Sequence, residues 1–311
     1  MTNNSSVSSS KGDFTIAYNM VASVVAVMSL TLYLRVCHVL WKHRDSHYAN
    51  PFYKLALALG LCDSIYLAQQ IVYLDVHMLA GAWVPSGYFY VSGIVNIFCV
   101  SSIIELIIII CINRAVAVFM LQKYSFYFTN NTVVIAIMIC VLLSLFNVGL
   151  MYGIGCYWHT PNGLTYRWRC ALADPVASKL ASLYIQVLTI SMTVAVAVLY
   201  GVIFVRLRRA AQNSSVMRKE SALTTQFGLI CLIYISYILS YWTTLWLTEE
   251  GLIPAEPGEM VVGFTGVLNS AINPFIYLGF STDIKAKVLN RPTATRVNPL
   301  SQIFRHSTRA P

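Results

Sequence analysis

Seven long apolar runs restrict what this chain can fold into more than any other feature of its sequence. A helix needs about 20 apolar residues to cross the ~30 Å of hydrocarbon in a bilayer, and each run is at least that long. Stretches such as ELIIIICI lack the alternation of a membrane β-strand, and backbone groups in lipid must bond within a helix. The sequence therefore predicts an all-α membrane protein, a seven-transmembrane helix bundle. We expect its spans over residues 14–40, 52–79, 87–119, 131–155, 178–205, 221–247 and 259–280.

A low content of charge supports a membrane protein. Only 11% of the 311 residues are charged and 57% are hydrophobic, whereas soluble domains carry roughly 25% charged residues. The connections YSFYFTNN and RLRRAAQNSSVMRKE are short and polar, so no soluble domain is expected between the spans.

The distribution of basic residues predicts the orientation, because Lys and Arg accumulate in cytoplasmic connections. One set of connections holds all of the 21 basic residues except Lys11, Arg167, Arg169 and Lys179. The N-terminus is therefore expected outside and the C-terminus inside. The expected layout is an extracellular glycosylated tail (1–13), the bundle (14–280), a short amphipathic eighth helix (281–290) and a cytoplasmic tail (291–311). The net charge of +9 reflects this bias and the anionic inner leaflet, so no nucleic-acid partner is indicated.

This orientation predicts two features of the outer surface. Asn3 and Asn4 lie in NNSS, which provides overlapping N-glycosylation acceptors. Cys156 and Cys170 are the cysteines that fall in an outer loop, where a disulfide can persist. The sequence leaves open whether these two cysteines pair.

Ionisable residues inside a span are costly and therefore indicate function. In this chain they are Asp63, Glu105 and, at a cytoplasmic end, Arg114. Asp63 has two interpretations: a carboxyl group that only hydrogen-bonds neighbouring helices, or a polar switch shared with the seventh span. The second interpretation is favoured because the seventh span carries Asn269, Ser270 and Asn273 at a similar depth.

The seventh span also contains a helix breaker. Pro274 frees a backbone carbonyl one turn earlier and bends the helix. Asn269 and Asn273 are four residues apart and lie on one face, which Tyr277 continues by another turn. A bent helix with a polar face is a plausible two-state element.

These motifs resemble those of rhodopsin-like G-protein-coupled receptors. NSAINPFIY is similar to the seventh-helix signature of that class, and Asp63 falls where the class places its second-helix aspartate. NRAVAV resembles the motif that closes the third helix, and STDIKAKVL resembles the eighth helix, with Ser281 or Thr282 as its N-cap and Ile284 facing lipid. The resemblance implies a plasma-membrane receptor, with sensory cilia as one location, that senses an extracellular small molecule and activates a heterotrimeric G protein.

Departures from that pattern narrow the resemblance. Asn113 replaces the acid of the third-helix motif, Ile103 replaces a sodium-site serine, and the fifth and sixth spans lack prolines. A short chain with such departures is most similar to nematode serpentine chemoreceptors.

The resemblance implies a ligand site between the third, fifth, sixth and seventh spans. Candidate ligand-binding residues are Asn96, Val100, Tyr184, Gln186, Tyr241, Trp242 and Trp246, although some of these aromatic residues could belong to the core or to an interfacial belt. Asn96 cannot offer a charge to an ammonium group, and the seventh span has no lysine for a Schiff base, so neither an amine nor retinal is favoured. Glu105 is expected to face the fourth or fifth span rather than the ligand. No cofactor or metal site is indicated.

Arg114 is either a topology charge that reaches the membrane surface or, as the resemblance implies, a contact for the G protein. Asn113 cannot act as the acid that restrains this arginine, so Glu220 is the remaining candidate partner. Loss of one charge-assisted contact, about 1.5–3 kcal/mol, predicts raised signalling without ligand.

Other classes remain as alternatives. A transporter would show internal repeats and paired broken helices, and a ligand-gated channel subunit would supply filter residues. An intramembrane enzyme would need a second catalytic group beside Asp63, and none is apparent, so the chain is not expected to be an enzyme.

Overall fold

The structure is a computed structural model that describes residues 4–43, 51–80, 86–153, 156–159, 167–170, 175–210 and 215–290. Its elements in chain order are α1 (Asn4–Lys42), α2 (Pro51–Ala80), α3 (Ser86–Phe119), η2 (Leu121–Lys123), α4 (Tyr124–Tyr127), α5 (Asn130–Gly153), β1 (Cys156–His159), β2 (Arg167–Cys170), α6 (Pro175–Ala210), α7 (Ser215–Glu249), α8 (Ala255–Ala271), α9 (Asn273–Phe280) and α10 (Thr282–Val288).

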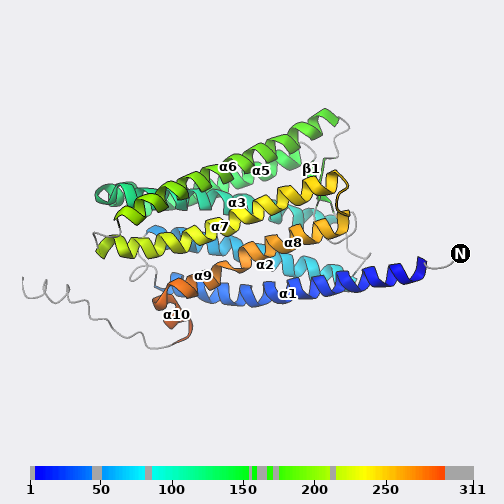
Figure 1. Cartoon of the computed structure of the whole chain (residues 1–311), viewed down its shortest axis with the longest axis horizontal. Helices are drawn as coiled ribbons and strands as arrows, with labels where there is room; N and C mark the ends of the chain where they lie inside the picture. Colours follow the sequence, from blue (N-terminus) through cyan, green and yellow to red (C-terminus); the bar gives the residue numbers. More distant parts are fainter. Residues whose placement is uncertain are drawn as a thin grey trace, which may run out of the picture.

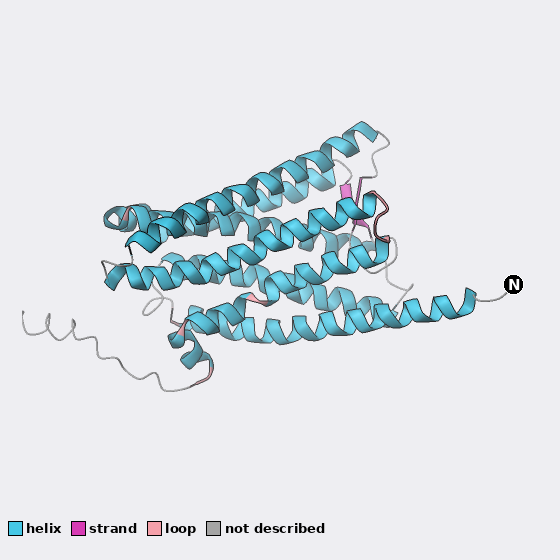
Figure 2. Cartoon of the chain, viewed as in Figure 1, coloured by secondary structure: helices cyan, strands magenta, loops and turns pink. Residues whose placement is uncertain are grey.

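The long helices lie side by side in one bundle (Figure 1). Within the described residues, seven spans are long and apolar enough to cross a membrane, and the last of them, Met260–Phe280, joins most of α8 to α9. The prediction of an all-α bundle with seven spans is therefore confirmed. The strands β1 and β2 form an antiparallel pair at the end of the bundle where α8 begins, and α10 lies at the opposite end (Figures 1 and 2).

The first helix differs from its expected bounds. It begins at Asn4, whereas the sequence predicts a polar tail up to residue 13. A helix that is already formed adds residues at little cost, because each new residue adds one backbone hydrogen bond. Residues 4–13, expected as part of the tail, thus belong to α1, and the extracellular position of this segment remains a prediction.

The last span is broken beside its proline. The amide of Ile272 bonds the carbonyl of Leu268 at 3.1 Å and closes α8, and the amide of Ile276 bonds the carbonyl of Ile272 at 3.2 Å and opens α9. Pro274 has no amide hydrogen to continue the ladder. The interruption between α8 and α9 is visible as a short non-helical segment in Figure 2. The expected bend is therefore a break at Ile272.

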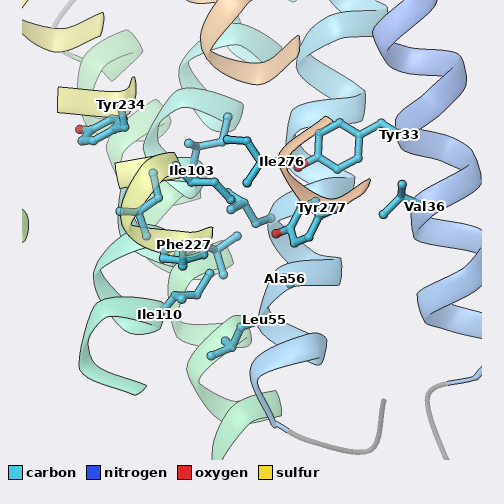
Figure 3. Packing of buried hydrophobic residues seen from close by; sticks show 14 of the residues in the cluster. Tyr33, Val36, Leu55, Ala56, Ile103, Ile110, Phe227, Tyr234, Ile276 and Tyr277 are labelled. Carbon is cyan, nitrogen blue, oxygen red and sulfur yellow. The ribbon is translucent and has the colours of Figure 1, made fainter. Parts of the chain in front are cut away.

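The core lies between α1, α2, α3, α7 and α9. Figure 3 shows part of it, with Tyr33, Leu55, Ile110, Phe227 and Tyr277 among the labelled side chains. Of the seven spans, those in α5 and α6 bury the smallest shares of their residues. Both helices pack against α3, whereas they make few contacts with each other.

The eighth helix is present as α10. Ser281 is its N-cap, and the Ser281 hydroxyl accepts a bond from the Ile284 amide at 3.2 Å. Ile284 is fully buried in the main core cluster. The expectation that Ile284 faces lipid is therefore wrong. The face of α10 that carries Ile284 is buried, and α10 packs against α1 and α9.

Candidate functional site

Asp63 joins three elements of the bundle. Its side chain is completely buried and accepts three hydrogen bonds: from Ser270 Oγ to Oδ1 at 2.7 Å, from Asn273 Nδ2 to Oδ2 at 2.8 Å, and from Tyr33 Oη to Oδ2 at 2.8 Å. The donors come from α8, α9 and α1, so Asp63 holds both sides of the break at Ile272. We call Asp63 and these three donors the carboxylate cluster. The expected contact of Asp63 with Ser270 and Asn273 is present.

Sequence reasoning missed Tyr33, the donor from α1. Its ring can lie here because Gly60, one turn before Asp63 on α2, has no side chain. A Cβ atom at Gly60 would lie 2.7 Å from Tyr33 Cε1 and 2.8 Å from Cys37 Sγ. A glycine on α2 and a tyrosine on α1 were the only signal for this contact in the sequence.

No hydrogen bond joins Asn269 to Asp63 in the described part of the chain. Asn269 is buried and lines a small cavity of about 10 Å³ together with Ser270, Tyr66 and Tyr237. This volume suits about one water molecule. Asn269 and Asn273 were expected on one face, but the break at Ile272 intervenes between them.

Pro274 and Tyr277 follow Asn273 along α9, and both are buried. The ring of Tyr277 lies 6.5 Å from that of Tyr33, and Figure 3 shows the two side chains close together. The Tyr277 hydroxyl and Asn273 Oδ1 are buried without a hydrogen-bond partner in the described part of the chain. These two polar groups are available to new partners if α9 moves.

Arg114 is buried inside the bundle. Its side chain is 0% exposed, its guanidinium carbon lies 4.3 Å from the centre of the Phe52 ring, and its Nε and Nη2 donate to Asn113 Oδ1 at 3.1 and 2.6 Å. Asn113 is not an acid, but its amide oxygen accepts two hydrogen bonds from Arg114, a contact that was not expected. The side chain of Glu220, in α7, lies outside the described residues.

Two further residues at this end were not anticipated. Phe52, at the start of α2, provides the aromatic face for Arg114. Tyr124, in the short α4, accepts a bond from Asn113 Nδ2 at 3.0 Å. A tyrosine in the connection after the third span was the available signal. Asn113 thus links α4 to Arg114.

A cavity of about 140 Å³ lies between α3, α5, α6 and α7. Its lining includes five of the expected ligand-binding residues, Asn96, Val100, Tyr184, Tyr241 and Trp242. Gln186 and Trp246 are not part of the lining, and Trp246 is 55% exposed on the bundle surface. Helical spacing predicts how deep each of the seven expected residues lies in the bundle, but not which side chains point into the cavity.

The helices around this cavity differ from the expected set. The fourth span contributes Asn147 and Met151, and the seventh span contributes no lining residue. The seventh span lies against α1, α2 and α7 instead. We call this space the α5–α6 cavity.

Glu105 both packs against the fourth span and lines the α5–α6 cavity. Its carboxylate accepts bonds from Ser144 Oγ at 3.2 Å and Asn147 Nδ2 at 3.4 Å. Ser102 orients Ser144 by donating to it at 2.8 Å. Packing against the fourth span was expected, whereas exposure to the cavity was not.

The outer-loop features are described only in part. Cys156 and Cys170 are opposite partners in the β1–β2 register, although their side chains lie outside the described residues. Asn3 also lies outside them, and Asn4 is the first residue of α1. Disulfide formation and glycosylation remain predictions. Searched over the described residues, the chain holds no metal-binding group of three or more ligand side chains.

A seven-span bundle with a buried carboxylate beside the break of its last span, and a buried arginine at the end of its third, is the architecture of a G-protein-coupled receptor. The chain belongs to the family of serpentine type seven-transmembrane GPCR chemoreceptors called Srv, whose model matches residues 22–293. This family consists of nematode chemoreceptors, as the sequence motifs predicted, and its members are receptors rather than enzymes. No curated protein matches the chain.

Proposed function

We propose that this protein is a plasma-membrane receptor that binds a small extracellular molecule in the α5–α6 cavity and activates a heterotrimeric G protein. The observation that carries this proposal is the carboxylate cluster, in which Asp63 bonds both sides of the broken last span. In this arrangement the N-terminus and the β1–β2 pair face outside, and Arg114 lies toward the cytoplasm.

A physical connection links the α5–α6 cavity to the carboxylate cluster. Val100 and Tyr237 line the α5–α6 cavity and also the small cavity beside Asn269 and Ser270. A ligand that displaces either side chain changes the packing around Ser270, which bonds Asp63. The ligand therefore favours one of two arrangements of α8 and α9 by differential contact.

The G-protein site is proposed at the other end of α3. Arg114 is buried between Phe52 and Asn113 and must leave them to contact a partner. Its restraint by a neutral amide is weaker than restraint by a carboxylate, because charge-assisted hydrogen bonds are roughly twice as strong. Activation without ligand is the expected consequence.

Ligand-free G-protein activation, measured per receptor at the cell surface, tests this proposal. Asn113→Asp places a carboxylate beside Arg114 and is expected to lower basal activation about tenfold, as a gain of ~1.5 kcal/mol in the resting state would. Arg114→Ala is expected to abolish activation and serves as the inactive control. Unchanged basal activation in Asn113→Asp, at equal surface expression, would contradict the proposed restraint.

A further inference from the structure

We propose that the α5–α6 cavity binds a small organic amine, with the ligand's positive charge at Glu105 and its hydrocarbon part among the aromatic side chains. This inference rests on the proposed receptor function and names the ligand class of the same site. The sequence disfavoured an amine because Asn96 carries no charge. Glu105, on the same span, provides a charge that this expectation did not include.

Glu105 has neutral hydrogen-bond partners in the described part of the chain. Its two carboxylate oxygens accept bonds from the neutral groups of Ser144 and Asn147. Among the described residues, no Lys, Arg or His pairs with this carboxylate. Ionisable side chains within a span normally pair with one another or face a pathway. A bound ammonium group would provide the missing charge.

Aromatic side chains in the lining of the α5–α6 cavity suit a cation. Tyr237, Tyr241 and Trp242 come from α7, and Tyr184 comes from α6. The faces of such rings attract an ammonium group within about 6 Å. Trp242 Nε1 is buried without an acceptor among the described residues, so the indole's polar edge is also available to a ligand. Two helices thus supply four aromatic rings to the cavity that Glu105 lines.

The size of the cavity limits the ligand. Its volume of about 140 Å³ is close to that of a cavity of ~150 Å³ that holds one benzene molecule. A single ring or a short branched chain carrying one amine fits this space. Larger amines with two ring systems do not.

Paired ligands on the purified full-length receptor in lipid nanodiscs test the inference. The probes are benzylamine and benzyl alcohol, cyclohexylamine and cyclohexanol, and isobutylamine and isobutanol. We expect at least one amine to raise the thermal unfolding midpoint at a concentration at least about tenfold below that of its alcohol. Glu105→Gln keeps the shape and an acceptor oxygen but removes the charge, so it is expected to abolish this preference.

Two further variants complete the test. Asp283→Asn removes a carboxylate from the Asp283–Lys287 pair on α10 and is expected to leave amine binding unchanged. Trp242→Leu removes an aromatic wall without touching the bonds of Glu105, and is expected to weaken amine binding about tenfold. If Glu105→Gln does not fold, Trp242→Leu decides.

The inference is overturned if no amine of the panel binds more tightly than its alcohol, or if the preference persists in Glu105→Gln. Should Glu105→Gln not fold, the inference is overturned if Trp242→Leu binds the amine as tightly as the wild type does. The binding readout requires no G protein. If an amine binds but Asn113→Asp does not change signalling, only the proposed restraint of Arg114 is contradicted. If Asn113→Asp lowers signalling but no amine binds, only the ligand class is contradicted.

Discussion

At the scale of single residues, Asp63 accepts hydrogen bonds from three other helices of the bundle. A carboxylate has about four acceptor positions, and three of them are used by Tyr33, Ser270 and Asn273. Hydrogen bonds to a charged group contribute about 1.5–3 kcal/mol each, which offsets part of the cost of burying the carboxylate. The position of each donor is therefore important for the stability of the resting state.

Gly60→Ala tests the donor from α1. A methyl group at this position would lie 2.7 Å from Tyr33 Cε1 and must displace that ring from Asp63. We expect a loss of about 1–3 kcal/mol in stability, the usual range for overpacking, seen as a lower thermal unfolding midpoint in nanodiscs.

The matched control for this prediction is Gly149→Ala in α5, where an added Cβ has no neighbour within 4 Å. Because alanine favours a helix over glycine by up to about 1 kcal/mol, this control is expected to be neutral or stabilising. Equal unfolding midpoints for the two variants would show that the close approach of Tyr33 to Gly60 is unimportant.

At the scale of elements, the break between α8 and α9 is the feature that allows movement. Ser270 and Asn273 lie on opposite sides of it and bond different oxygens of Asp63. The angle between the two helices can therefore change if the bonds to Asp63 break. Asn273 Oδ1 and the Tyr277 hydroxyl, which have no partner in the described part of the chain, can then form new hydrogen bonds. A hinge at a few residues is a common basis for switching.

Pro274→Ala is expected to reduce this movement. Alanine restores an amide donor for the carbonyl of Ser270 and favours one continuous helix through Ile272. We expect ligand-free G-protein activation to fall several-fold at equal surface expression.

Pro175→Ala provides the control for this prediction. Pro175 is the first residue of α6, where proline is well tolerated because no helix bond is lost. Basal activation is expected to remain at the wild-type level in this variant. A reduction as large as that in Pro274→Ala would argue against a specific role of the break.

At the scale of the whole molecule, α5 and α6 are held to each other mainly through α3 and through the β1–β2 pair that connects them in sequence. The register places Cys156 opposite Cys170. Opposite residues of antiparallel strands have Cα atoms ~4.5–5.5 Å apart, which lies within the range that a disulfide spans. A disulfide here would stabilise the end of the α5–α6 cavity.

Peptide mass spectrometry of the purified receptor under non-reducing conditions is expected to find Cys156 linked to Cys170. Closing a loop of about 15 residues contributes about 3 kcal/mol, so Cys156→Ser should lower the unfolding midpoint. Cys62→Ser, at a free cysteine within α2, serves as the control. Alkylated Cys156 and Cys170 in the native receptor would disprove the bond.

Much of the fold and part of the candidate site could be predicted from the sequence. The lengths of the apolar runs determined the seven spans, and Pro274 determined a break in the last of them. The polar residues Asp63, Ser270 and Asn273 could be matched because each is rare in its span, and costly groups in lipid must meet one another.

Only the tertiary structure decided which neighbours complete these sites. Tyr33 at Asp63, Phe52 at Arg114 and the exposure of Glu105 to the α5–α6 cavity depend on the rotation and spacing of helices far apart in the sequence. Hydrophobicity, length and a missing amide are properties of one segment, so the sequence alone determines them. Rotation about a helix axis in a membrane is set by close packing between small and large side chains, as at Gly60 and Tyr33, and these contacts exist only once the helices assemble.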